Sequence, residues 1–322
     1  MSPLEITMIV ISSATLLGYT IARSLAIQPT IGILSLSLIL VTLAHLLEPL
    51  TGRLDLIESG INFTQNTDFR SILLDTMLPI LLFAGAMSMN ARYFKKHKFT
   101  ILTLAIFSTF ASTAIIGFSF YYLCSFLSID IELIHCLLFG ALISPTDPVA
   151  VVALVKKSNL APDIEAKIAG ESLFNDGVGI VLFLTLYHLA FDPAANITPQ
   201  GVISYFLQEA VGGCLIGVIS GLFCRKLIAH DAKHSHNHII ISIFIVTGIY
   251  TLTNNLHMSG ALAVVVAGLF MADFTSNSPK DYQPLKYFWE SLEDILNMVL
   301  YLLLGLEAVS YTHLTLPTIL LV

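Results

Sequence analysis

The sequence predicts an all-α polytopic membrane protein. Its 322 residues are 56% hydrophobic and only 11% charged, and the mean hydropathy is +0.83. The apolar residues gather into about ten spans that are long enough, or nearly so, to cross a hydrocarbon core about 30 Å thick at about 1.5 Å per residue. Strand-like alternation of apolar and polar residues is absent from the sequence. This composition excludes an ordinary soluble globular class.

The spans follow one another along the whole chain. The first has no clear cleavage site and is followed at once by the second, so it is predicted to be a retained helix rather than a signal peptide. The four cysteines lack metal-like spacing and are predicted to be packing residues. The predicted spans are residues 4–22, 30–47, 71–89, 99–127, 131–155, 168–190, 202–223, 239–252, 259–274 and 292–306.

The basic residues predict the orientation of these spans. With the amino terminus outside, alternation of the connections puts all of the 15 basic residues except Arg53 and Arg70 on the cytoplasmic side. Short cytoplasmic connections carry an excess of Lys and Arg in membrane proteins. We therefore expect a multi-pass protein of the cell inner (plasma) membrane with its amino terminus outside.

The histidine-rich segment His230–His238 is predicted to be a solvated connection between two spans. Its four histidines admit a metal site or a pH sensor as an alternative. A metal site needs rigid ligand spacing, and no nearby cysteine or carboxylate pair supports one.

The fifth span holds the first polar centre. Within the apolar stretch Gly140–Ala153, Asp147 lies between Pro145 and Pro148. A charge at membrane depth costs about 2.5 to 3.5 kcal/mol on insertion scales, and each proline removes a backbone donor. Unwound backbone at this depth needs protein or a water-filled cavity around it. The segment therefore predicts a broken helix at a polar centre of the bundle.

The sixth span holds a second polar centre, Gly170–Gly177. Glu171 and Asn175 are four residues apart, as are Ser172 and Asp176, so on a helix these four groups form one polar patch. The connection between the two spans is short, which makes them antiparallel neighbours. We expect the two polar centres to meet near the middle of the membrane.

Together the two centres offer oxygen ligands. These are the carboxylates of Asp147 and Asp176, the hydroxyls of Ser172 and Thr146, the amide of Asn175, and carbonyls freed by the prolines. Oxygen ligands suit a hard cation, and the low charge suits a monovalent one. Buried carboxylates also bind protons, so cation and proton compete for one site. Such a site, exposed to each side in turn, is sufficient for exchange and needs no cofactor.

Three alternatives are open at this point. Polar groups in membrane bundles can serve only to link helices, but three carboxylates in two adjacent spans are expensive for that purpose. A cation channel would show a repeated filter or symmetric pore helices, and neither is visible. An intramembrane aspartyl enzyme would need Asp147 and Asp176 to share a proton and a water molecule.

These segments resemble the sodium/hydrogen exchanger family, specifically the bacterial NhaP-like branch of monovalent cation:proton antiporters. The resemblance covers residues from about 10 to 307, and the Thr-Asp-Pro and Asn-Asp motifs at this separation are specific. The matching segments are residues 79–85, 144–150, 170–177, 257–268 and 289–307.

The resemblance implies a role for each polar residue. Asp176 is implied to be the main carrier of cation and proton. The neutral amide beside it, Asn175, implies electroneutral 1:1 exchange, since electrogenic relatives carry two adjacent aspartates. The other implied roles are coordination by Asp147, Ser172 and the main chain of Thr146, support from Glu171 and Asn175, and helix breaking by Pro145 and Pro148.

The resemblance also implies the architecture and the partners. We expect an NhaA/NhaP-like inverted-repeat antiporter fold with crossed discontinuous helices, in which about ten spans are present of about thirteen. The expected function is a transporter, not an enzyme, that exchanges Na⁺ for H⁺ across the bilayer, with Li⁺ and K⁺ as alternative cations. A homodimer is implied, and no nucleic acid is expected to bind.

The end of the chain departs from the resemblance. We expect residues 1–307 to form an incomplete sodium/hydrogen exchanger transmembrane domain and residues 308–322 to be a non-family tail, arising from truncation or a reading-frame artefact. No arginine follows Arg225, so the basic residue that pairs with the counterpart of Glu171 in the family is missing. Removing one partner of a buried ion pair costs about 3 to 5 kcal/mol. We therefore expect the chain as written to be unstable or inactive.

Overall fold

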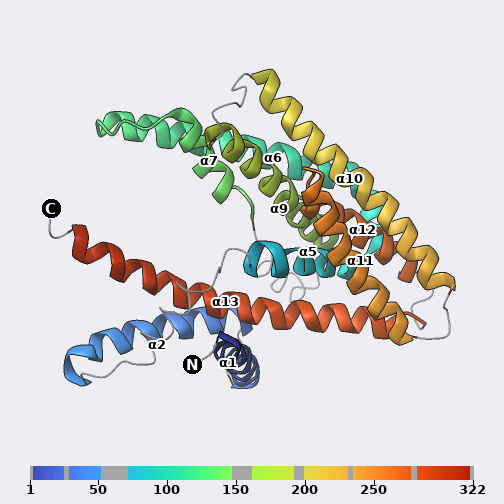
Figure 1. Ribbon diagram of the computed structural model, residues 1–322, viewed down its shortest axis with the longest axis horizontal. Helices are drawn as coiled ribbons and strands as arrows, with labels where there is room; N and C mark the ends of the chain where they lie inside the picture. The colour runs from blue at the N-terminus through green and yellow to red at the C-terminus, as the bar shows by residue number, and fades with distance from the viewer. Residues whose placement is uncertain are drawn as a thin grey trace. The chain divides into compact units, whose positions relative to one another are not determined.

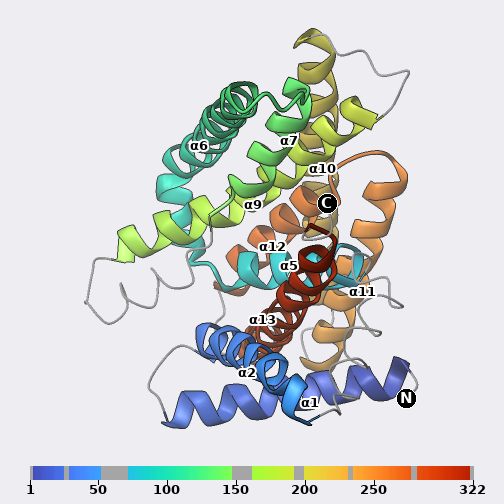
Figure 2. The ribbon, with the colours of Figure 1, turned by 90° about the vertical axis from the view of Figure 1, so that its left-hand side faces the viewer.

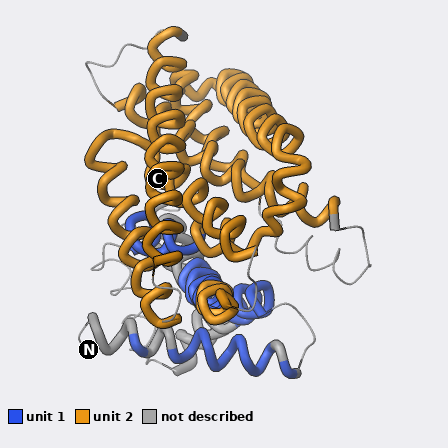
Figure 3. The backbone as a smooth tube through the Cα atoms, turned by 90° about the vertical axis from the view of Figure 1, so that its right-hand side faces the viewer, with its two compact units in different colours: residues 1–81, 291–322 blue, residues 82–290 orange. Residues whose placement is uncertain are grey.

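The computed structural model describes residues 3–24, 29–51, 72–146, 162–191, 199–230, 235–276 and 281–319. Every regular element within these ranges is a helix (Figures 1 and 2), which confirms the predicted all-α class. The chain divides into two compact units, one of residues 1–81 and 291–322 and the other of residues 82–290 (Figure 3).

The helices follow the predicted spans closely. Each of the ten predicted spans overlaps a described helix. Among the described helices, those covering residues 91–126, 163–191, 200–230 and 235–255 are long and apolar enough to cross a membrane by length and composition. The total number of spans stays a prediction. The elements are α1 Pro3–Ser24, α2 Pro29–Thr51, η1 Ile72–Met77, α5 Leu78–Ser88, α6 Ala91–Phe126, α7 Leu133–Ile143, α9 Pro162–Phe191, α10 Pro199–His230, α11 Ser235–Asn255, α12 Gly260–Ser276 and α13 Gln283–Ile319.

Several predicted boundaries differ from the structure, and the start of the last helix and the histidine-rich segment differ in an informative way. The last helix begins at Gln283, nine residues before the predicted start of the final span, because Trp289 is buried and donates a hydrogen bond to Ser242 Oγ at 3.0 Å. The segment His230–His238 is not simply a solvated loop. Its first residue ends α10 and its last four begin α11, where His238 is buried with its ring 5.4 Å from that of Tyr282.

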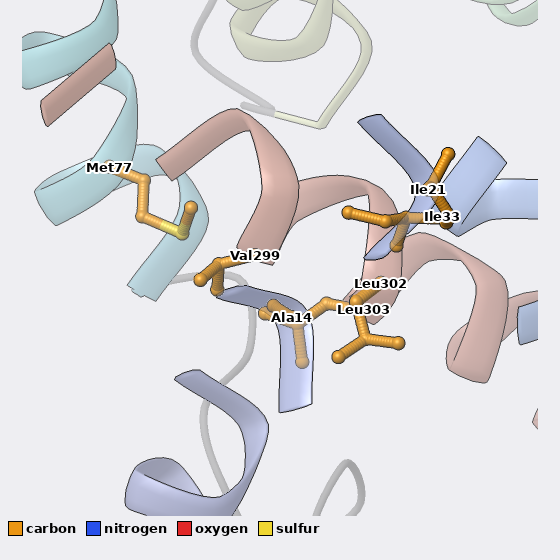
Figure 4. Close-up of a cluster of buried hydrophobic side chains, with 7 residues drawn as sticks. All are labelled: Ala14, Ile21, Ile33, Met77, Val299, Leu302 and Leu303. Carbon is orange, nitrogen blue, oxygen red and sulfur yellow. The ribbon is translucent and has the colours of Figure 1, made fainter. Parts of the chain in front are cut away.

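The first unit is held together by an apolar cluster. Most of the side chains come from helices at the two ends of the sequence, α1, α2 and α13, and Met77 comes from η1 (Figure 4). Small residues permit the close approach: Gly305 faces Ser37, and Gly18 faces Met298. Small residues at helix contacts are typical of membrane bundles. The cluster consists of Ala14, Ile21, Ile33, Met77, Val299, Leu302 and Leu303.

The second unit is built around α12. Almost every side chain of α12 between Gly260 and Ala272 is buried, and α10 lies along it with Gly213, Gly217 and Gly221 at the contact. These glycines are four residues apart and so share one face of α10. On its other side α12 approaches α5, where Gly268 faces Phe83.

Helices α6, α7 and α9 form another part of the second unit, and each contacts the other two. At the end of α6, Ile129 N donates to Cys124 O at 2.9 Å and Ser128 N to Ser125 O at 3.1 Å, with Ser128 at φ 58°. This is a Schellman motif, which satisfies the last carbonyls of a helix and reverses the chain. The turn lets α7 run back along α6.

Candidate functional site

The end of α7 lies inside the predicted fifth span, next to Pro145. Helix α7 ends at Ile143 and Ser144–Thr146 are not helical. Ser144 Oγ donates to Gly140 O at 2.7 Å and lies 3.0 Å from Thr113 Oγ1 of α6. Pro145 has no backbone donor with which to continue the helix. Asp147 and Pro148, which the sequence analysis places in the site, lie outside the described residues.

The end of α7 is positioned by a close crossing with α6. A Cβ atom added to Gly140 would lie 2.5 Å from Thr113 O and 3.0 Å from Gly117 N, both backbone atoms of α6. Backbone atoms cannot move aside as a flexible side chain can, so this crossing admits only glycine without a shift of the helices. The crossing therefore fixes where the chain leaves α7 and where Thr146 lies.

Thr146 joins the broken helix to the polar patch of α9. Ser172 Oγ donates to Thr146 O at 2.9 Å, and Asn175 Nδ2 donates to Thr146 Oγ1 at 2.8 Å. The carbonyl and the hydroxyl of one residue thus both contact α9. The two polar centres therefore contact each other, as expected, through Thr146, Ser172 and Asn175.

Glu171 lies at the edge of the same network. Its Oε1 accepts from Asn175 Nδ2 at 3.2 Å, one turn along α9, and from Ser108 Oγ of α6 at 3.3 Å. Within the described part of the chain, no Lys, Arg or His nitrogen forms an ion pair with Glu171, so its partners are neutral donors. The sequence analysis did not find Ser108, because nothing in the sequence distinguishes it from the other hydroxyl residues of the spans.

One acceptor in the network lacks a donor. Asn175 is 1% exposed, and its Oδ1 has no hydrogen-bond partner among the described residues, while its Nδ2 is used twice. Ser172 is 3% exposed, and Asp176, one turn after Ser172, is half-buried. A buried acceptor without a donor is uncommon in proteins. The oxygen atoms of this site can accept a proton donor or bind a hard cation.

Ion pairs link the starts of α6 and α9 and the end of α12. Lys95 of α6 lies 2.6 Å from Asp273 of α12, and Lys96 lies 2.9 Å from Asp163 at the start of α9. The adjacent His97 lies 3.2 Å from the same Asp163. The sequence analysis assigned these lysines only to a cytoplasmic connection, because pairing between distant segments has no local signal.

Sequence comparison identifies relatives over most of the chain. The sequence model of the family described as "Sodium/hydrogen exchanger, transmembrane" matches residues 9–322. The Na⁺/H⁺ antiporter NhaP of Pseudomonas aeruginosa is 32% identical over 308 residues, which cover 94% of this chain and 72% of that protein. The Na⁺/H⁺ antiporter NhaH of Halobacillus dabanensis is 30% identical over 76% of this chain and 60% of its own length. The matched range includes residues 308–322, and the predicted domain boundary at 307 stays a prediction.

The fold also matches a solved structure. The sodium proton antiporter MjNhaP1 of Methanocaldococcus jannaschii superposes with a TM-score of 0.70 at 21% identity, over 94% of this chain and 71% of the other. This confirms the predicted NhaP-like antiporter fold. The relatives carry the names of antiporters and exchangers, which excludes the enzyme alternative. By sequence and by fold, the chain therefore belongs to the sodium/hydrogen exchanger family, whose members are multi-pass membrane transporters.

Proposed function

We propose that the protein exchanges a monovalent cation for protons at the site formed by the break after α7 and the polar patch of α9. The observation that carries this proposal is the buried Asn175 Oδ1, an acceptor without a donor, in a network that includes Thr146 and Ser172. A bound cation would complete that network, as oxygen ligands favour hard cations. The names of the relatives support the same activity.

Asp176 is proposed as the carrier, with Asp147, which lies outside the described residues, as its partner. Ionised, these carboxylates bind the cation with Ser172 and the main chain of Thr146; protonated, they release it. Burial disfavours the charged form of a carboxyl group and a bound cation favours it, so the two ligands exclude each other. This competition couples the two flows without a further component.

Asn175 is proposed to keep the exchange electroneutral. Its side chain is an amide whose Nδ2 donates to Thr146 Oγ1 and to Glu171 Oε1. An amide holds these contacts without titrating, so one carboxylate carries one charge per cycle. Glu171 and Asn175 together fix the shape of the site, and the donors to Glu171 are the neutral groups Ser108 Oγ and Asn175 Nδ2.

The membrane location, the orientation and the oligomeric state proposed for the protein are those predicted from the sequence. We propose that the protein lies in the inner (plasma) membrane with its amino terminus outside, as the distribution of basic residues indicates, and that it functions as a homodimer. Na⁺ is the proposed cation, because the relatives are named Na⁺/H⁺ antiporters. K⁺/H⁺ exchange is the alternative within the same mechanism.

Proteoliposomes test the proposal directly. The complete protein that contains this sequence is reconstituted with Na⁺, Li⁺ or K⁺ inside, and the internal pH is followed on dilution, with and without a membrane-potential clamp of K⁺ and valinomycin. Exchange acidifies the interior as the cation leaves. An acidification that is insensitive to the clamp supports electroneutral exchange.

The other outcomes discriminate between the alternatives. A pH change with K⁺ but not with Na⁺ or Li⁺ would support the proposed site and identify K⁺ as the transported cation. Cation efflux without any pH change points to a channel and overturns the proposal. Alkalinisation of the interior contradicts exchange of a cation for a proton.

A further inference from the structure

Helices α9 and α10 share a second set of polar side chains, distant from Asp176. Thr185 is nine residues after Asp176, which is about 13 Å along the helix and half a revolution around it. It therefore faces away from the proposed transport site. It lies next to Glu209 of α10, and one turn further His188 Nε2 lies 2.8 Å from the Tyr205 hydroxyl. We call these two pairs, Thr185–Glu209 and His188–Tyr205, the α9–α10 polar ladder.

The register of the two helices supports the ladder independently. In two antiparallel helices, the sequence numbers of residues that lie opposite each other have a nearly constant sum. The sums for Thr185–Glu209 and His188–Tyr205 differ by only one. Phe206 of α10 packs on the cluster of Leu182 and Leu186 between the rungs. The polar pairs are therefore embedded in an apolar interface.

The inner rung is incompletely bonded. Thr185 is completely buried, and neither its Oγ1 nor Glu209 Oε2 completes a hydrogen bond of ordinary geometry among the described residues. The backbone of Glu209 is occupied separately, since Ser259 N donates to Glu209 O at 3.1 Å. The nearest basic residue that follows on α10, Arg225, lies about 24 Å along the helix. Glu209 thus has no cationic partner on its own helix.

The Thr185 hydroxyl and the Glu209 carboxyl lie next to each other without a hydrogen bond of ordinary geometry. An unpaired ionised carboxylate in an apolar interface is expensive, and intramembrane carboxyl groups mark functional sites. A proton on Glu209 removes that charge, and the protonated carboxyl can donate to Thr185 Oγ1, whereas an ionised carboxyl can only accept from it. A metal ion would need more ligands than this rung offers.

We propose that Glu209 and Thr185 form a proton-binding site between α9 and α10, separate from the transport site, in which the Glu209 carboxyl donates to Thr185 Oγ1. Loss of the proton leaves a charged carboxylate between the two helices and weakens their contact. The outer rung leads from this site toward the end of α9 and the start of α10, where His188 can relay the proton.

Other titratable groups adjoin the site. They are His188 on α9, Tyr205 on α10, Tyr250 on α11, whose ring lies beside Gly260, and the exposed His257 in the turn before α12. None of these is a carboxyl group. A signal from a protonated carboxyl in this interface therefore belongs to Glu209.

Carbodiimide labelling tests the site without ion transport. Dicyclohexylcarbodiimide modifies protonated carboxyl groups in apolar surroundings, and peptide mass spectrometry locates the modified residue. We expect labelling at Glu209 at neutral pH and a rate that falls about tenfold per pH unit above the midpoint of its titration. Glu132, with 81% of its side chain exposed, is the internal control and should remain unlabelled. Equal labelling of the two residues, or labelling of Glu209 that is independent of pH, would overturn the proposal.

Infrared spectroscopy tests the proton site even where dicyclohexylcarbodiimide does not reach Glu209. The spectrum of the unmodified protein minus that of Glu209→Gln should contain the carbonyl band of a protonated carboxyl at neutral pH. Thr185→Val should shift that band to higher frequency, because it removes the hydrogen bond, and Thr185→Ser should not. A difference spectrum with carboxylate bands alone would show that Glu209 is ionised and would refute the proton site.

The proton site at Glu209 can be tested separately from the proposed exchange function. Both measurements are repeated in Asp176→Asn, a variant expected to transport nothing. The labelling and the infrared band of Glu209 should persist there, and added Na⁺ should leave them unchanged. Loss of either would show that Glu209 belongs to the transport site and would overturn its separateness.

Discussion

Two polar layers lie on opposite sides of α9, and they differ in how completely they are bonded. Around Thr146, the side chains of Ser172, Asn175 and Glu171 form a chain of hydrogen bonds with α7 and α6. Around Glu209, the facing oxygens lack a bond. Ser172, Asn175 and Thr185 are buried, whereas Thr146 and Ser108 of the first layer and Tyr205 of the second are exposed.

The difference teaches what each layer can bind. The first leaves one acceptor, Asn175 Oδ1, among several other oxygen atoms; it suits a cation that is held by several oxygens at once. The second has only a carboxyl and a hydroxyl and suits a single proton. In both layers a buried polar atom without a partner indicates a missing ligand.

The largest expected effect comes from removing the carboxylate of the first layer. Asp176→Asn keeps the shape but cannot ionise, so exchange should fall at least about a hundredfold, as expected when the only carrier of an intramembrane charge is lost. Asp130→Asn, at an exposed turn between α6 and α7, is the matched control and should transport normally. Proteoliposome pH measurements compare the two. Normal exchange by Asp176→Asn would remove the assigned carrier.

The next effect concerns the crossing that positions Thr146. Gly140→Ala places a Cβ atom 2.5 Å from the backbone oxygen of Thr113, and overpacking of this kind costs about 1 to 3 kcal/mol. Gly248→Ala in α11 is the control, because nothing lies within 4 Å of the added atom. Thermal unfolding in detergent should show a lower midpoint for the first variant only. Equal midpoints would show that the α6–α7 crossing tolerates a shift.

A change of charge in the first layer tests stoichiometry. Asn175→Asp adds a second carboxylate beside Asp176, and like charges in one site raise the affinity for protons. We expect the exchange rate to become dependent on the membrane potential, measured with the valinomycin clamp at several K⁺ gradients. A rate that stays independent of the potential would show that Asn175 does not set the stoichiometry.

The smallest effect is expected at the hydroxyl of Thr146. Thr146→Val keeps the carbonyl that accepts from Ser172 but removes the acceptor of Asn175 Nδ2, which still donates to Glu171. The loss of one such bond is worth about 1 kcal/mol, so the apparent cation affinity should fall about fivefold, and Thr146→Ser should match the unmodified protein. Complete loss of exchange in Thr146→Val would show that the hydroxyl itself binds the cation.

Much of the first layer was predictable from the sequence because its signals are local. A proline removes a backbone donor, and two prolines close together in one apolar span, Pro145 and Pro148, favour the end of a helix near them, which is where α7 ends. Polar residues four apart on a helix share a face, so the contact between Glu171 and Asn175 follows from spacing. These two segments are among the five on which the family resemblance rests, and that resemblance led to the fold.

Other contacts had no such signal. Ser108, Thr113 and Glu209 look in the sequence like many polar residues in apolar spans, and their partners lie on other helices. The start of α13 was misplaced because the burial of Trp289 against Ser242, not local polarity, decides that the helix extends to Gln283.

The class of the protein, the end of α7 near Pro145 and the polar patch of α9 could be predicted from the sequence, because composition, proline positions and helical spacing act within one segment. No local signal indicates that Thr146 bonds to α9 through both of its oxygens, that Asn175 Oδ1 lacks a donor, or that Thr185 faces Glu209. Those facts depend on the register and the closeness of helix pairs. Register and closeness are set by glycines and apolar side chains across the whole interface, so no single segment encodes them.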